Sequence, residues 1–179
     1  MKTEGLQGKN TASLDDDVVD GYRRNVGIVL CNTDTQVLWA RRSRHDGWQF
    51  PQGGIESNET AEEAVYRELY EEIGLLPRHV DLIGATQKWL HYDVPIEFKR
   101  LNGSHFRGQK QLWFLFKMLT EDSDIRLDIA NKPEFDRWRW VDYWTPLQQI
   151  VAFKRGVYKQ ALTELEPFAL QVASAPKAM

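Results

Sequence analysis

The sequence predicts a layered α/β fold built as one domain. Segments with the composition of β-strands occupy residues 25–32, 36–42, 80–90, 109–120 and 137–141. Two longer segments, 60–74 and 158–170, have the character of helices. Strands interspersed with helices are typical of α/β proteins. A chain of 179 residues is long enough to bury one sizeable core.

The first two predicted strands form a hairpin. Apolar residues dominate 25–32 (NVGIVLCN) and 36–42 (QVLWARR), and the TDT sequence between them is typical of a turn. The next extended piece, 48–50, is short because Pro51 follows it. It leads into the glycine pair Gly53-Gly54 and then into the first main helix.

The second half of the chain supplies the remaining strands. We expect strands over 80–90 and 109–120, the latter containing the apolar run QLWFLFKML. The stretch 137–141 (RWRWV) alternates arginine and tryptophan, which predicts a strand with one aromatic and one basic face. We expect the last helix, 158–170, to be interrupted at Pro167.

The chain ends and the cysteine content set the domain limits. Residues 1–20 contain few large apolar side chains and no periodicity, so we predict a disordered arm there, a single domain over 21–170 and a flexible tail over 171–179. The lone Cys31 excludes an intramolecular disulfide framework. No apolar run approaches the ~20 residues that span a bilayer, and no signal-peptide segment is present. We therefore expect a cytoplasmic protein with no membrane partner.

The charge distribution is more informative than the net charge. A formal charge of −3 argues at first against a nucleic-acid partner. However, local basic patches decide whether phosphates are attracted. Such patches occur at Arg41, Arg42 and Arg44, at Lys99 and Arg100, at Arg107 and Lys110, and at Lys154, Arg155 and Lys159.

The segment 60–74 has complete signals for a helix. Thr60 can cap its N-terminus, and Glu63 can reach back to complete a capping box. Gly74 is placed to end the helix in the left-handed conformation. An apolar stripe with helical spacing can pack on a core; it consists of Ala61, Val65, Leu69 and Ile73.

Three glutamates lie on an adjoining arc of this helix. Glu68, Glu71 and Glu72 are neighbours there because positions i, i+3 and i+4 meet on a helix surface. Glutamate-rich helices are most often solvated acidic faces, but such faces usually include lysines, whereas Arg67 is the only base in this half of the helix. Clustered carboxylates beside a glycine-rich loop suit a hard divalent cation, above all Mg²⁺.

The spacing of these residues resembles the signature of the Nudix hydrolase family. The resemblance implies a mixed sheet between helices, an α/β/α sandwich, and cleavage of a nucleoside diphosphate linked to another moiety. It also implies that Mg²⁺, for which Mn²⁺ can substitute, is held by Glu68, Glu71 and Glu72 with Gly53, and that Arg67 belongs to the catalytic set. The matching positions are Gly53, Glu59, Arg67-Glu68-Leu69, Glu71-Glu72 and Gly74-Leu75.

Further segments resemble the bacterial RNA 5′ pyrophosphohydrolase group of this family. This resemblance implies removal of phosphates from triphosphorylated or diphosphorylated RNA 5′ ends to leave a monophosphate, which promotes mRNA decay. Glu134, in the sequence PEFD, then resembles an additional metal ligand, and Glu68 the general base. One departure is Arg24, where the pattern has proline. The resembling stretches are DGYR and NVG from Asp20, WARR from Trp39, WQFPQGG from Trp48, GQKQ from Gly108, PEFD from Pro133 and FKR from Phe153.

The same group implies a set of substrate contacts. Arg23 and Arg42 resemble phosphate or base contacts, with solvated strand-end arginines as the alternative. Phe153 resembles part of a cleft for an RNA base, although its apolar ring also suits a core position. The substrate-side set comprises Arg23, Arg42, Gln109, Lys110, Val151, Phe153 and Lys154.

Two other functions are compatible with these residues. The group overlaps in sequence with dinucleoside polyphosphate hydrolases, so a dinucleoside polyphosphate is an alternative substrate. A second alternative is a non-catalytic module that binds RNA or nucleotides. The intact glutamate trio argues against a pure binder, because such a module has no need of three mutually repelling carboxylates.

Overall fold

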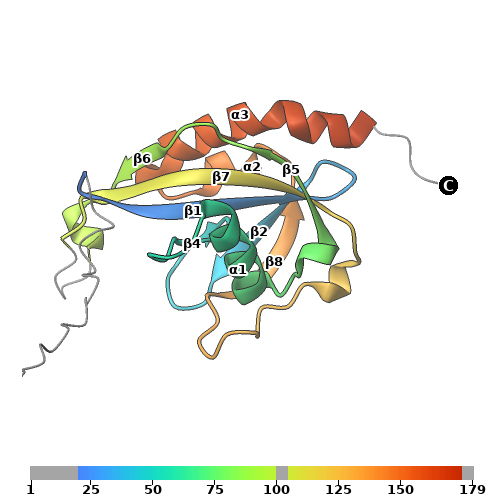
Figure 1. Cartoon of the computed structure of the whole chain (residues 1–179), viewed down its shortest axis with the longest axis horizontal. Coiled ribbons are helices and arrows are strands. Elements are labelled where there is room, and N and C mark those ends of the chain that lie inside the picture. Colours follow the sequence, from blue (N-terminus) through green and yellow to red (C-terminus); the bar gives the residue numbers. More distant parts are fainter. Residues whose placement is uncertain (1–19, 100–104, 175–179) are drawn as a thin grey trace, which may run out of the picture.

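The protein is a mixed sheet packed between helices (Figure 1). The structure is a computed structural model that describes residues 20–99 and 105–174. The predicted N-terminal arm and the end of the predicted tail lie outside these residues, apart from Asp20 and 171–174. In chain order the elements are β1 (Tyr22–Cys31), β2 (Val37–Arg42), β3 (Trp48–Gln49), β4 (Gln52–Gly54), α1 (Ala61–Ile73), η1 (Pro77–His79), β5 (Val80–Ala85), β6 (Leu90–Asp93), η2 (Ile96–Phe98), β7 (Gly108–Met118), η3 (Asp122–Asp124), β8 (Phe135–Val141), α2 (Thr145–Gln149), η4 (Ala152–Lys154) and α3 (Arg155–Ser174).

The parallel pair β1–β7 forms the centre of the sheet. The two strands pair over the whole length of β1, from Tyr22 opposite Gly108 to Cys31 opposite Lys117. The other strand pairs are antiparallel: β4 and β2 with β1, β5 and β6 with β7, and β3 and β8 with β2. The predicted β1–β2 hairpin and the α/β class are therefore confirmed.

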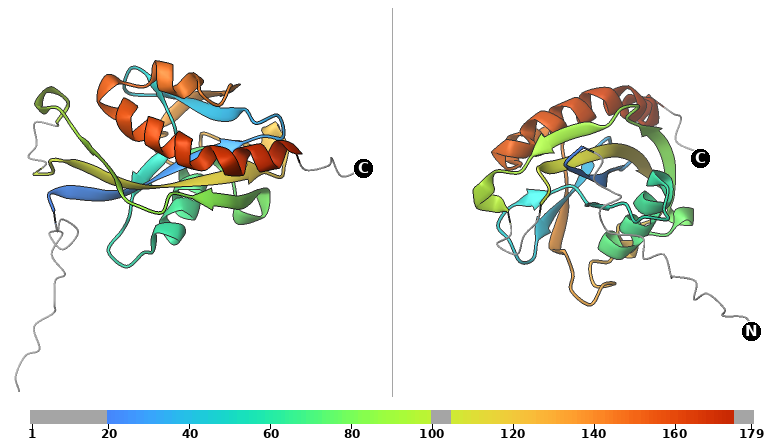
Figure 2. Two further views of the ribbon diagram at one scale, coloured as in Figure 1. Left: turned by 90° about the horizontal axis from the view of Figure 1, so that it is seen from above. Right: turned by 60° about the vertical axis from the view of Figure 1, so that its left-hand side comes forward.

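Alternation along the central strands divides the core into two layers. On β1, Ile28 and Leu30 belong to the layer beneath α1, whereas Val29 and Cys31 belong to the layer beneath α3. Successive strand residues point to opposite faces, so one strand supplies both layers. Figure 2 shows α1 and α3 on opposite sides of the sheet. Helices thus cover both faces.

The expected single strand over 80–90 is wrong, because the chain forms two strands there. β5 ends at Ala85, opposite Phe114, and β6 begins at Leu90, opposite Gln111. Between them the Gln87 N–H donates to the Glu164 carboxylate on α3, at 2.8 Å. The main chain therefore leaves the β7 ladder to bond with the helix that covers this face.

The expected interruption at Pro167 is also wrong. α3 runs without a break from Arg155 to Ser174. Proline removes one intrahelical hydrogen bond, but Leu165 and Ala169 on either side of it are buried against the sheet. Tertiary packing therefore outweighs the local helix-breaking tendency. None of the helices in the described part of the chain is long and apolar enough to cross a membrane.

Candidate active site

The helix α1 carries the glutamate trio, and its ends are fixed as the sequence predicts. The Thr60 hydroxyl accepts a hydrogen bond from the Glu63 N–H at 3.1 Å, and the Glu63 carboxylate accepts one from the Thr60 N–H at 2.8 Å. Gly74 ends the helix at φ 76°, a conformation that glycine adopts without steric cost. On the inner face of α1, Val65 and Leu69 are fully buried. The cap and the buried stripe together set the rotation of the helix, and hence the direction of the glutamates.

Arg67 organises the carboxylates of α1. Its guanidinium donates to Glu59 at 2.6 and 2.9 Å, to Glu68 at 2.7 Å and to the Gly54 carbonyl at 2.8 Å. Glu71 lies 3.3 Å from the same guanidinium, as its helical spacing predicts. These partners hold the pKa of Arg67 above its ordinary value, and the largest cause is the hydrogen bonding that Arg67 donates to Glu59. Arg67 therefore ties the helix to the glycine-containing strand β4.

Glu68 lies directly against Gly53. A Cβ atom at position 53 would stand 1.9 Å from the Glu68 carboxyl carbon, so any side chain there would displace the carboxylate. Glu68 is only 8% exposed. Burial raises the pKa of Glu68, while Arg67 acts in the opposite direction. Gly53, which was predicted to act with the glutamate trio, therefore packs directly against one of its members, Glu68.

Glu72 lies where the negative charges concentrate. Its carboxylate accepts a hydrogen bond from the Gln52 N–H at 3.1 Å. Its pKa is raised well above the ordinary value, first by burial and then by the charges of Glu68, Glu134 and Glu71. The other three predicted metal-ligating carboxylates therefore lie near enough to Glu72 to repel its charge. Repulsion of this kind is relieved when a cation binds.

Glu134 reaches this region from the segment that precedes β8. Its carboxylate lies 3.5 Å from Arg42 Nε and 3.4 Å from an Arg44 guanidinium nitrogen. Its carbonyl oxygen accepts a hydrogen bond from the Ser43 N–H at 2.9 Å. The segment carrying Glu134 is thus held against the loop that follows β2.

The donors fit a hard divalent cation in their chemistry. Carboxylate oxygens are the ligands that such cations prefer, and the raised pKa of Glu72 reflects their crowding. In the described part of the chain, no three acidic, histidine or cysteine side chains are already gathered in a chelating arrangement. Glu68 is instead turned to Arg67, and Glu134 to Arg42 and Arg44.

A small cleft lies on the α3 side of the carboxylates. We call it the base cleft; its volume is about 110 Å³. The Phe153 ring is half-buried there, 5.1 Å from the Phe98 ring and 6.0 Å from the Tyr92 ring between centroids. Val151 is 39% exposed at the same cleft. The lining residues are Arg42, Asp46, Gly47, Trp48, Gln49, Phe98, Ile150, Val151, Phe153 and Lys154.

Lys154 is buried at the inner end of the base cleft. Its ammonium group donates to the Gln49 amide oxygen at 3.2 Å and lies 5.6 Å from the centre of the Tyr92 ring. Burial lowers the pKa of Lys154 to about 8, and the charge of Arg42 acts in the same direction. A buried lysine with a single amide partner is unusual.

The other predicted substrate residues are not gathered in this cleft. Arg23 extends over Gly54, where its guanidinium would lie 2.6 Å from an added Cβ. Gln109 accepts a hydrogen bond from the Tyr92 hydroxyl at 2.8 Å, and Tyr92 links it to Phe153. Lys110 forms an ion pair with Asp20 at 3.0 Å. Arg23 thus lies beside the glycine strand and Lys110 near the start of β1.

A buried amide network beneath the glycine strand was not predicted. The Gln111 amide nitrogen donates to Asn25 at 2.7 Å and to Gln52 at 3.3 Å, and the Gln52 N–H in turn holds Glu72. Glu59, the main partner of Arg67, was predicted only as a motif position. Neutral amides give no charge or spacing signal, so only the strand register brings these three side chains together.

This chain is similar to proteins of known family and fold. A family model described as the NUDIX domain matches residues 21–161. The RNA pyrophosphohydrolase of Halorhodospira halophila is 55% identical over 149 residues, which cover 83% of this chain and 82% of that protein. The RNA pyrophosphohydrolase of Xylella fastidiosa strain M12 is 57% identical over 154 residues, covering 86% and 81%. The solved structure of the E. coli dihydroneopterin triphosphate pyrophosphohydrolase shares the fold, with a TM-score of 0.63 at 21% identity, covering 79% of this chain and 97% of that one.

Proposed function

Because this chain belongs to the Nudix family, whose hydrolases generally use divalent metal ions, we propose that it is a Mg²⁺-dependent RNA 5′ pyrophosphohydrolase. It removes pyrophosphate, or successive phosphates, from triphosphorylated or diphosphorylated RNA and leaves a 5′ monophosphate, which promotes mRNA decay. Two relatives named RNA pyrophosphohydrolase, more than 50% identical over most of both chains, support the substrate class.

The crowding of negative charge around Glu72 supports the proposal. Glu72 is surrounded by the charges of Glu68, Glu71 and Glu134, and Gly53 leaves space for the Glu68 carboxylate at the sheet. A pure binding module has no use for this repulsion. We therefore propose Glu68, Glu71, Glu72 and Glu134 as the metal ligands, next to Gly53, with Mn²⁺ able to replace Mg²⁺.

The residues of this chain have separate tasks in the reaction. Bound Mg²⁺ supplies charge neutralisation of the polyphosphate oxygens and a water of lowered pKa. Arg67 orients Glu68 and anchors α1 to the Gly54 carbonyl. Burial raises the pKa of Glu68. Glu68 is our candidate to accept the proton of the attacking water.

The base cleft is our candidate site for an RNA base beyond the cleaved phosphates. Phe153 and Val151 offer apolar contact, while Arg42 and Lys154 bring positive charge to the same cleft. Aromatic side chains bind unstacked bases of single-stranded RNA in this way. Arg23 remains a proposed phosphate or base contact. Gln109 and Lys110, at the start of β7, remain proposed polar contacts on the substrate side.

One competition assay tests the function. Triphosphorylated RNA and a dinucleoside tetraphosphate are supplied at equal, sub-saturating concentrations, and the ratio of kcat/KM values measures preference. We expect the RNA to be preferred. A preference for the dinucleoside tetraphosphate would transfer the activity to the alternative substrate class. Binding of RNA with no hydrolysis of either compound would favour the non-catalytic module.

A further inference from the structure

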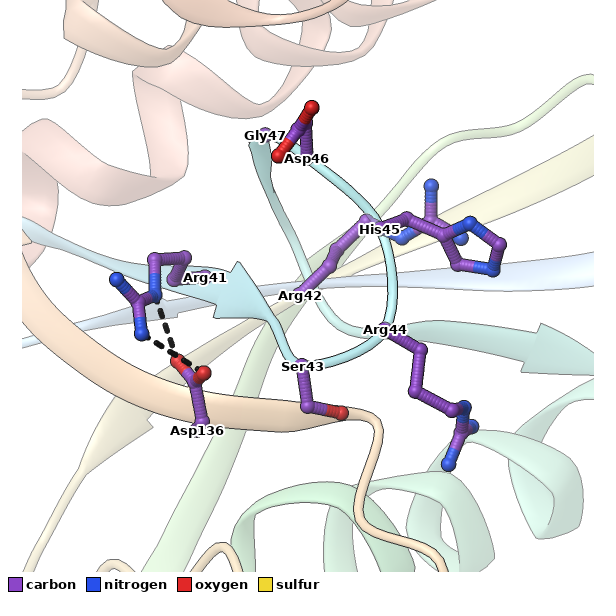
Figure 3. A pocket seen from close by; sticks show the side chains of 8 residues that line it. All are labelled: Arg41, Arg42, Ser43, Arg44, His45, Asp46, Gly47 and Asp136. Carbon is purple, nitrogen blue, oxygen red and sulfur yellow. Dashed lines mark hydrogen bonds and ion pairs between the residues drawn. The ribbon is translucent and has the colours of Figure 1, made fainter.

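The loop between β2 and β3 forms a second hollow beside the base cleft (Figure 3). We call it the basic hollow; its volume is about 620 Å³. Arg42, Asp46 and Gly47 line both the basic hollow and the base cleft, so the two are adjacent. The basic hollow is lined by Arg41, Arg42, Ser43, Arg44, His45, Asp46, Gly47 and Asp136.

Backbone hydrogen bonds hold this loop in place. The Arg42 N–H donates to the Gly47 carbonyl at 3.0 Å, which closes the loop at its base. The Ser43 N–H donates to the Glu134 carbonyl at 2.9 Å, and the Ser43 hydroxyl donates to the Pro133 carbonyl. The loop therefore presents its side chains from a backbone that is closed at its base and tied to the segment preceding β8.

The arginines of the basic hollow differ in how far their charge is neutralised. Arg41 forms two hydrogen bonds with Asp136, at 2.7 and 2.8 Å, so this pair is closed. Arg42 and Arg44 share the single carboxylate of Glu134, at 3.5 and 3.4 Å. Two guanidinium groups therefore share one carboxylate, and the remaining acidic residue of the lining, Asp46, lies at the opposite end of the hollow from Arg44 (Figure 3).

Arg44 is the accessible member of that pair. Its side chain is 51% exposed, against 30% for Arg42. Figure 3 shows Arg44 extending from the loop on the side away from Arg41 and Asp136. Glu134 is also a proposed metal ligand, so cation binding by Glu134 would leave both guanidinium groups free for another anion.

We propose that the basic hollow binds a backbone phosphate of the RNA downstream of the nucleotide in the base cleft, and that Arg44 makes this contact. The proposal rests on the proposed function. An RNA chain that enters the base cleft continues into a phosphodiester, and the basic hollow begins where the base cleft ends. Arginine suits such a contact because its planar guanidinium matches phosphate oxygens. Nucleoside triphosphates and dinucleoside polyphosphates have no downstream phosphodiester.

The test compares two substrates at saturating Mg²⁺. kcat/KM is measured on a triphosphorylated RNA of ten nucleotides and on a triphosphorylated dinucleotide, and their ratio is compared between wild type and Arg44→Gln. We expect the ratio of kcat/KM on the longer RNA to kcat/KM on the dinucleotide to fall about tenfold in Arg44→Gln, because one charge-assisted contact is lost. For the longer RNA, the slope of log kcat/KM against log salt concentration should become less negative by about 0.7. Arg44→Lys keeps the charge and should retain most of that slope.

The control is an exposed arginine at the other end of the sheet. Arg78 lies in η1, next to Val80, which pairs with Met118 at the end of β7 opposite to Gly108. Arg78→Gln should leave the ratio unchanged. An unchanged ratio in Arg44→Gln, or an equal loss on both substrates through Glu134, overturns the proposal. A wild-type enzyme that hydrolyses neither RNA overturns the proposed function instead.

Discussion

Arg67 and Lys154 are two buried or half-buried cations near the candidate carboxylates, and the protein holds them in opposite ways. Arg67 binds Glu59, Glu68 and the Gly54 carbonyl at distances below 3 Å. Lys154 is more deeply buried, yet its ammonium group has one amide partner, Gln49. Correspondingly, the pKa of Arg67 is raised and the pKa of Lys154 is lowered to about 8.

This difference separates a structural cation from one that is available to a ligand. The guanidinium of Arg67 is matched by carboxylates of its own helix and loop, so its charge orients Glu68. A buried ammonium group without a carboxylate partner is costly, and an anion bound in the base cleft would relieve that cost. We therefore assign Arg67 to the metal side of the site and Lys154 to the substrate side.

The largest effect is expected for Glu72→Gln. Removing one metal ligand should lower kcat about a thousandfold, since metal stabilisation of the transition state is worth several kcal/mol. The metal-free protein should keep its melting temperature or gain a little, because one of the mutually repelling charges is gone. Steady-state kinetics and thermal melts check both results. Glu62→Gln, an exposed change on the same helix, is the control and should change neither.

The pH dependence of the Glu72 effect follows from its raised pKa. A carboxyl group whose pKa is higher in the folded state is penalised when it ionises. The metal-free wild type should therefore lose stability as the pH rises above the ordinary glutamate value, whereas Glu72→Gln should lack this component. Parallel loss of folding and activity in Glu72→Gln would instead make this glutamate structural.

Next in size is Arg67→Ala, which tests the structural side of the comparison. It would leave Glu59 and Glu68 largely buried without their cation. Breaking such a pair costs about 3 kcal/mol, and urea unfolding measures it directly. Arg67→Lys should recover only part of the stability, because an ammonium group cannot reproduce the contacts with both carboxylates and Gly54. An Arg67→Ala variant as stable as wild type would contradict the assignment of Arg67 as a structural cation.

Phe153→Ala tests the base cleft. Stacking of one base contributes roughly 1–3 kcal/mol, or about five- to 150-fold in binding. kcat/KM on triphosphorylated RNA should fall by that factor, while a nucleoside triphosphate, which has no following base, should be barely affected. Phe153→Leu keeps most of the apolar volume and should preserve the melting temperature while losing the RNA preference. Equal losses on both substrates, with a lower melting temperature, would make Phe153 a core residue.

The smallest effect concerns the protonation of Lys154. Its charge is lost as the pH rises through about 8, so kcat/KM on RNA should decline there by about fivefold, the worth of one weak charge contact. Lys154→Met should lack this step, so wild type and variant should converge near pH 9.5. The lowered pKa also penalises the charged form, so wild-type stability should rise between pH 8 and the ordinary value of 10.5. If the pH profiles of kcat/KM for wild type and Lys154→Met stay parallel, this prediction is wrong.

Local signals predicted the frame of the site well. Thr60, Glu63 and Gly74 obey short-range rules of helix capping, and the structure confirms each of them. Pro167 and the 80–90 strand were mispredicted, because buried contacts of Leu165 and the bond from Gln87 to α3 depend on distant residues. The proposed residue roles remain predictions.

The features that sequence reasoning missed are those that tertiary packing creates. Lys154 was expected to offer charge, but its burial is decided by Tyr92 and Gln49, which are distant in the chain. The bond from Gln111 to Gln52 depends on the register of three strands. Helical spacing alone places Glu63 and Glu71 equally near Arg67, yet the Glu63 carboxylate accepts the Thr60 N–H in the capping box.

The central claim is that the glutamates of α1 and Glu134 form a divalent cation site. Its most direct test is the melting temperature of wild type, Glu72→Gln and Glu134→Gln during titration with Mg²⁺ and no substrate. A ligand that binds only the folded state stabilises it by RT ln(1 + [L]/Kd), which grows as the ligand concentration exceeds the Kd. We predict that the wild-type melting temperature rises with Mg²⁺ and that both variants need a much higher concentration for the same rise. Three superimposable titration curves would contradict the claim.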